Sequence, residues 1–161
     1  MTHFFKVTAL RGAIAAAALA GTTAAQAQPA AETFTFQTEA SNQVGVGNDG
    51  TRSVPYFAGY VVGTSQTTFA DGTKRAGNYT CVSMSQTPTD KLFDVHMLCD
   101  VTDSQGSYSA ALGCTVIDAA TTNWSCIGGL YGNTGAYEGR RGSVTNHSVA
   151  GAATGTGQWY R

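Results

Sequence analysis

A glycine-rich stretch near the C-terminus is the first part of the sequence that could do chemistry. Residues 128–144 read GGLYGNTGAYEGRRGSV and carry an acid at Glu138 and two cations at Arg140 and Arg141. Glycine-rich loops beside positive charge often bind phosphate. Here the P-loop ending Gly-Lys-Ser/Thr and the G-x-G-x-x-G spacing are both missing, and a strand-like segment follows. The stretch therefore predicts a structural turn, whose glycines supply positive φ and close backbone approach and whose charges lie at the surface.

Two histidines are candidates for acid–base catalysis. His96 lies in the segment DVHML, where period-two spacing puts Asp94 and Asp100 on its side of a strand, as for a base oriented by a carboxylate. A solvated strand face would show the same pattern. His147 has no acid visibly paired with it, and the chain lacks the G-x-S-x-G motif, so a Ser-His-Asp hydrolase has no support.

One arginine and several aromatic residues could form a ligand pocket. Arg75 and Tyr79 share the expected inner face of one strand, where a cation is costly unless it lies at a strand end or in a polar pocket. Aromatic walls with a few hydroxyls suit a flat, partly polar ligand, and ordinary core packing is the competing interpretation. The candidate catalytic residues are therefore Arg75, Tyr79, His96 and His147, and the candidate ligand-binding residues are Tyr56, Tyr60 and Trp124.

The first 27 residues have the pattern of a secretory signal peptide. Lys6 and Arg11 precede or flank the small apolar run GAIAAAALAG, and residues 25–27 read AQA, the A-x-A form of a cleavage site. The apolar run is too short for a retained membrane span, which takes about 20 residues. We expect export to the periplasm or beyond the cell, and a mature domain of residues 28–161.

The charge balance argues against nucleic acid as a partner. The chain has 9 Lys and Arg against 10 Asp and Glu, a net charge of −1. Loss of Lys6 and Arg11 with the leader leaves 7 cations against 10 acids, a net charge of −3. Phosphate backbones require a concentrated basic surface, so no nucleic-acid partner is expected.

Four cysteines, all beyond the leader, are expected to form two disulfides. Exported domains favour disulfides, and the absence of a C-x-x-C pair makes a metal site the weaker interpretation. If the turn TPTD is centred near residue 90 and the turn DAATT near residue 120, Cys81 faces Cys99 and Cys114 faces Cys126 across two hairpins. A one-residue shift in register would break both pairings.

The hydrophobic pattern of the mature chain is that of short strands. No window has sustained helical periodicity, and runs rich in Val, Thr, Tyr and Phe alternate with turn residues. Strands are expected at 33–39, 55–64, 74–85, 91–102, 108–118, 122–128, 142–149 and 154–160. Such spacing predicts an all-β antiparallel meander, either a barrel or a sandwich, and about eight strands can close into a barrel with no exposed edge. The expected inner face carries the cysteines with Tyr79, Phe93, Val95, Met97, Val101, Leu112, Val116 and Trp124.

The C-terminal glycine stretch also carries a family resemblance. GLYGNTGAYEGRRGSV is similar to the G-[GS]-[TS]-G-x-[YF]-x-G-x-x-G signature of allene oxide cyclase-like and dirigent-like β-barrels, and departs from it at Asn133. The turns FADGT and DSQGSY resemble those of small exported bacterial members. The resemblance covers about the last two-thirds of the mature chain, and fold likeness alone is weak evidence of function.

This resemblance implies a fold and a type of activity. It implies a single-domain, eight-stranded antiparallel barrel of the calycin-like kind, with an apolar cavity and often assembled into a homo-oligomer. Characterised relatives steer cyclisation, isomerisation or coupling of reactive small molecules without a cofactor or metal. The relatives' catalytic residues cannot be transferred, because the matching segment is structural.

Three functions fit the sequence. The leading hypothesis is a cofactor-independent isomerase, cyclase or lyase, in which the barrel holds a small hydrophobic or aromatic molecule and Arg75, Tyr79 or a histidine polarises it. The second is a periplasmic carrier of the same kind of molecule, without chemistry. The third is a structural envelope protein with a solidly packed barrel. A cavity without ionisable groups would favour the carrier over the enzyme.

Overall fold

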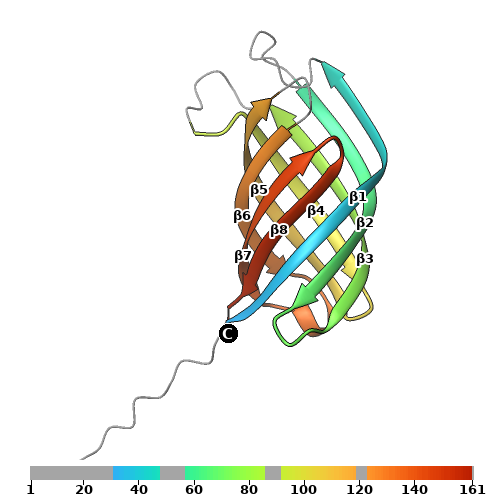
Figure 1. The fold of residues 1–161 in the computed structure, drawn as a ribbon, viewed down its shortest axis with the longest axis vertical. Coiled ribbons are helices and arrows are strands. Elements are labelled where there is room, and N and C mark those ends of the chain that lie inside the picture. Colours follow the sequence, from blue (N-terminus) through green and yellow to red (C-terminus); the bar gives the residue numbers. More distant parts are fainter. Residues whose placement is uncertain (1–30, 48–56, 86–91, 119–122, 161) are drawn as a thin grey trace, which may run out of the picture.

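Eight antiparallel strands close into a barrel, as predicted (Figure 1). The computed structural model describes residues 31–47, 57–85, 92–118 and 123–160. In order around the barrel these are β1 (Glu32–Gly47), β2 (Phe57–Phe69), β3 (Lys74–Ser85), β4 (Val95–Asp103), β5 (Gly106–Asp118), β6 (Asn123–Gly132), β7 (Arg141–Val149) and β8 (Ala152–Trp159). Each strand pairs with the next, and β8 pairs with residues 32–39 of β1, which closes the barrel.

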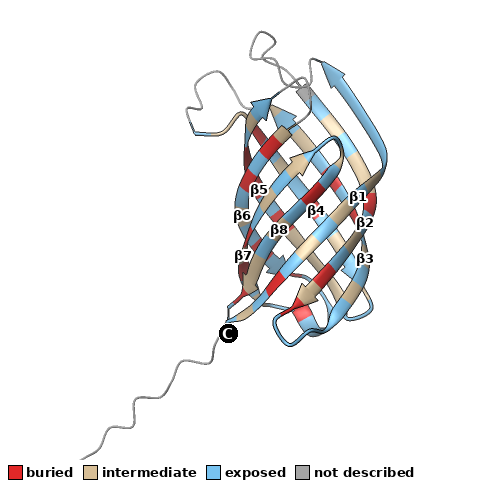
Figure 2. Cartoon of the chain, in the orientation of Figure 1, coloured by how far each residue is buried: buried red, intermediate tan, exposed pale blue. Residues whose placement is uncertain are grey.

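The alternation of side chains along each strand decides what lies inside. In β3 the even-numbered positions are exposed, whereas Tyr79 and Cys81 are buried (Figure 2). Because antiparallel partners in register share a face, the same alternation continues around the barrel. The buried apolar side chains thus meet along the barrel axis, in a core that includes Phe34, Phe69, Leu112, Trp124, Leu130, Val144 and Trp159.

Two disulfides bridge neighbouring strands on the inner face. Cys81 in β3 lies opposite Cys99 in β4, and Cys114 in β5 lies opposite Cys126 in β6. Each pair is bonded, with Cα atoms 4.0 Å apart. The predicted pairing is confirmed, and with it the register of both hairpins. Most residues of the two turns that gave this register lie outside the described parts of the chain.

Several strands extend beyond their predicted ends. β1 continues to Gly47 rather than residue 39, β2 to Phe69 rather than residue 64, and β6 to Gly132 rather than residue 128. The extensions of β1 and β6 contain glycines, which resemble turn residues in sequence. Pairing holds them in strands, with β2 alone for the β1 extension and with both β5 and β7 for the β6 extension. A register shift between Ala40 and Asn42 marks a bulge, which allows the long β1 to bend around the barrel.

The beginning of β4 differs from the prediction. The strand starts at Val95, not at residue 91, and the backbone N–H of Asp94 donates to the carbonyl of Cys114 at 2.9 Å. The Asp94 carboxylate accepts the N–H of Val116 at 2.9 Å, so it caps the adjacent β5 backbone instead of facing solvent. Phe93 was expected in the core, but its ring packs over Gly113, where no Cβ would fit beneath it. Gly113 lies between the inward Leu112 and Cys114, so Phe93 covers the outer face.

The glycine-rich stretch forms the predicted turn and closes one end of the barrel. A 3₁₀ turn, η1 (Gly135–Tyr137), follows β6. Gly135 has φ +63°, in the left-handed region, and Gly132 lies so close to the Tyr137 carbonyl that a Cβ would clash. This path returns Tyr137 to the barrel end, where it is 1% exposed and its ring centroid lies 5.1 Å from that of Tyr108 and 5.3 Å from that of Trp159. We call these three rings the aromatic plug.

The charges of this stretch lie around the plug. Glu138 and Arg141 are exposed, as predicted. Arg140 is half-buried and forms an ion pair of 2.6 Å with Glu32 at the start of β1. Arg140 thus fastens the turn to the rim of the barrel.

Candidate functional site

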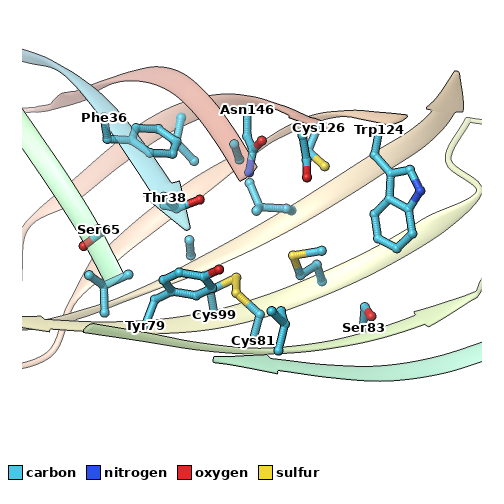
Figure 3. Close-up of a pocket in the computed structure, with 18 of the residues that line it drawn as sticks. Phe36, Thr38, Ser65, Tyr79, Cys81, Ser83, Cys99, Trp124, Cys126 and Asn146 are labelled. Atoms are coloured by element: carbon cyan, nitrogen blue, oxygen red, sulfur yellow. A yellow bond between two sulfur atoms is a disulfide. The ribbon is translucent and has the colours of Figure 1, made fainter. Parts of the chain in front are cut away.

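A cavity of about 130 Å³ lies inside the barrel. Its wall is mainly apolar and contains the sulfur atoms of the disulfides, together with side chains such as Phe36, Val61, Met97, Leu112 and Trp124 (Figure 3). The aromatic plug lies at the end where β1 begins and β8 ends, and Tyr108 of the plug borders the cavity. The interior is therefore hollow, which both ligand-based hypotheses require.

The polar part of the wall is uncharged. No Asp, Glu, Lys, Arg or His of the described strands lines the cavity. Because a charge in an apolar interior is costly without a partner, this wall favours a neutral ligand. The polar lining residues are Thr38, Gln43, Tyr60, Ser65, Thr67, Tyr79, Ser83, Tyr108, Asn146 and Ser148.

Two tyrosines that line the cavity, Tyr79 and Tyr108, are hydrogen-bonded to threonines and have raised pKa values. Burial raises the pKa of Tyr79, and its hydrogen bond with Thr38 offsets only part of that rise. Burial also raises the pKa of Tyr108, with smaller contributions from Tyr137 and Asp103 and an opposing hydrogen bond with Thr67. Both phenols therefore stay protonated at physiological pH.

The candidate ligand-binding residues have different positions. Trp124 is buried and lines the cavity. Tyr60 borders the cavity along β2, but its register with Val44 and Val82 puts its side chain on the outer face, where the residue is 42% exposed. Val61, its neighbour, is the inward residue because it lies opposite Cys81. Tyr56 lies outside the described residues.

Of the four candidate catalytic residues, only Tyr79 lines the cavity. His96 is exposed on the outside of β4, with its ring edge-on to Phe93 at 5.7 Å between centroids. His147 is exposed on the outside of β7, and its Nε2 lies 2.8 Å from Asn123 Oδ1. The fold does not bring either histidine to the interior beside Tyr79.

Arg75 lies at the closed end of the barrel, outside the cavity wall. It is the second residue of β3, and its guanidinium lies 4.3 Å from the centroid of the Phe69 ring. Arg75 Nη1 donates to the Tyr137 hydroxyl at 3.0 Å, and that hydroxyl donates to Asp103 Oδ2 at 2.5 Å. Arg75 thus lies at a strand end and has a polar partner, and both conditions lower the free-energy cost of burying its charge.

Sequence reasoning missed Asn146 as a lining residue. It lies on the inner face of β7 between Val144 and Ser148, opposite Cys126 of β6. The residue of β7 that the sequence suggested, His147, lies on the outer face of the strand. The alternation of side chains along the strand could have identified Asn146, because it is two residues from the buried Val144 and so points to the same face.

The described part of the chain shows neither a metal-binding cluster nor a membrane-spanning helix. No three of its His, Cys, Asp and Glu side chains lie close enough together to hold a metal ion. None of the helical segments described has the length and hydropathy needed to cross a membrane. Comparisons of the chain with models of protein families, with curated proteins and with solved structures gave no match.

Proposed function

We propose that this barrel binds and carries small, neutral, largely apolar molecules. The observation that supports the proposal is the interior cavity of about 130 Å³, which no charged side chain of the described strands lines. For scale, an apolar cavity of about 150 Å³ in another protein binds benzene, so a molecule built on one ring is the expected size. The protonated tyrosines and the hydroxyls can orient such a molecule without neutralising a charge.

We also propose that the carrier works outside the cytoplasm and is a distant member of the allene oxide cyclase-like group. The leader-like residues 1–27 support export, and two disulfides are compatible with an oxidising compartment. The closed eight-stranded barrel and the glycine-rich turn agree with what the resemblance implies. Family membership itself stays a prediction.

Filling the cavity is expected to remove binding. Ala110 is 7% exposed and lines the cavity, whereas its neighbour Ala111 is exposed on the outer face of β5. Ala110→Leu places three extra carbons in the void and should weaken the binding of toluene at least about fivefold, because overpacking a site typically costs about 1–3 kcal/mol. Titration calorimetry measures the affinity, and mass spectrometry of the purified protein identifies any molecule already bound.

Ala111→Leu is the matched control, and it should bind toluene as the wild type does. A toluene affinity that is equal in both variants and the wild type would mean that the molecule binds elsewhere than in the cavity.

A catalytic role is the second candidate, and one observation favours it. Tyr79 holds a protonated hydroxyl in the cavity wall, where it could donate a hydrogen bond to a substrate carbonyl and so promote an isomerisation. Tyr79→Phe should then abolish conversion of the co-purified molecule, followed by NMR, while circular dichroism shows an unchanged fold. If the wild type leaves that molecule unconverted, the carrier proposal holds and the catalytic one fails.

A further inference from the structure

Asn146 differs from Tyr79 and Tyr108, the hydrogen-bonded tyrosines of the cavity wall. Its side chain points from β7 into the cavity, on the same wall as Cys126 (Figure 3). Its Oδ1 is fully buried and has no hydrogen-bond partner. By contrast, the two lining tyrosines already have partners, Tyr79 in Thr38 and Tyr108 in Thr67.

An unpaired amide oxygen is an unfavourable feature of an apolar wall. A buried polar group that lacks a hydrogen bond loses its hydration without compensation, so most proteins pair or replace such groups. A leucine would have nearly the same shape and no such cost. The position therefore makes physical sense if a bound molecule completes the hydrogen bonding of the amide.

The amide itself defines the complementary group. It presents a hydrogen-bond acceptor beside a donor. The last torsion angle of an asparagine side chain (χ2) has a broad distribution, so either the oxygen or the nitrogen can turn towards the cavity. A neutral group that also has a carbonyl beside an N–H can make two hydrogen bonds with it. A carboxylate would find no cation among the described lining residues.

We propose that Asn146 is the recognition group of the cavity, and that the bound molecule is a neutral, single-ring compound with a carboxamide-type group directed at it. The ring lies against the apolar wall, and the carboxamide pairs with Asn146. This inference rests on the proposed binding function, but it adds a chemical class that binding alone does not require.

Four probes of nearly the same shape test this selectivity. Benzamide has both donor and acceptor, acetophenone has the acceptor only, α-methylstyrene has neither, and benzoate is charged. Their affinities are measured by titration calorimetry for the wild type, for Asn146→Leu and for the control Thr145→Leu on the outer face. Asn146→Leu should weaken the binding of benzamide about tenfold and leave the binding of α-methylstyrene unchanged or tighter. The difference between the two changes is the contribution of the hydrogen bonds to binding.

The control and the outcomes separate the two proposals. Thr145→Leu should retain the wild-type affinities, and benzoate should bind more weakly than benzamide to the wild type. If α-methylstyrene binds but Asn146→Leu changes all affinities equally or none, the recognition role of Asn146 is overturned while the carrier survives. If none of the neutral probes binds the wild type, both proposals fail.

A melting experiment without any probe distinguishes recognition from a structural role. Because Asn146→Leu removes a buried amide oxygen that has no hydrogen-bond partner, the ligand-free variant should melt at the same temperature as the wild type or higher. A lower melting temperature, with Thr145→Leu unchanged, would show that Asn146 serves the fold and would overturn the inference.

Discussion

Replacing all four cysteines by alanine should lower the free energy of unfolding by about 6 kcal/mol. The disulfides join residues 18 and 12 positions apart, and the entropy lost by the unfolded chain gives about 3 kcal/mol for each loop. Since domains of this kind are stable by only about 5–15 kcal/mol, this loss would remove between about two-fifths and all of the stability. Denaturant titration followed by circular dichroism measures the loss.

Two double variants show whether the bridges act independently. Removing Cys81 with Cys99, or Cys114 with Cys126, should each cost about 3 kcal/mol, because the loop term changes only slowly with length. Wild-type protein unfolded in the presence of a thiol reductant should match the fourfold variant. A fourfold variant within 1 kcal/mol of the oxidised wild type would contradict the prediction.

The disulfide pairing was predictable because it depends on local geometry. In a meander each strand pairs with its neighbours in the chain, so a turn centre fixes which residues lie opposite each other. Two turn signals therefore placed Cys81 opposite Cys99 and Cys114 opposite Cys126. The number and spacing of the strands predicted a barrel or a sandwich, and the family resemblance implied the barrel.

Features that depend on distant residues were less accessible. Phe93 has the parity of a core residue, but the chain bends before β4 because Asp94 bonds to the backbone of β5, 22 residues along the chain. The glycine stretch could be recognised as a turn, but the burial of Tyr137 depends on Arg75 and Asp103, which come from two other strands. The periodicity of a sequence does not indicate contacts between side chains of distant strands.

The candidate site was predictable only in part. Period-two alternation placed Tyr79 and Trp124 inward, and both line the cavity. Alternation cannot distinguish a packed interior from a hollow one, because that difference depends on summed side-chain volumes across eight strands. For the same reason, the sequence drew attention to the reactive histidines, while the unpaired amide of Asn146 became notable only when its surroundings were known.

Truncation of the plug at Tyr137 should be the next most damaging change. Tyr137→Ala removes a ring that is 1% exposed and that packs against Tyr108 and Trp159, and comparable aromatic truncations cost about 3–5 kcal/mol. The change also leaves Arg75 and Asp103 without the hydroxyl that joins them. Denaturant unfolding measures the loss, and proteolysis should detect loosening at the plugged end.

Tyr137→Phe separates the contribution of the ring from that of the hydroxyl. Burial first, and then the hydrogen bond to Asp103, raises the pKa of Tyr137 to about 12, so the hydroxyl is a neutral donor across the physiological range. The phenylalanine variant keeps the ring and loses only this bridge, so it should cost about 1–3 kcal/mol, less than the alanine variant. Equal losses in the two variants would assign the stability of the closed end to the Arg75–Tyr137–Asp103 bridge. Negligible loss in both would mean that the turn closes the barrel without the plug.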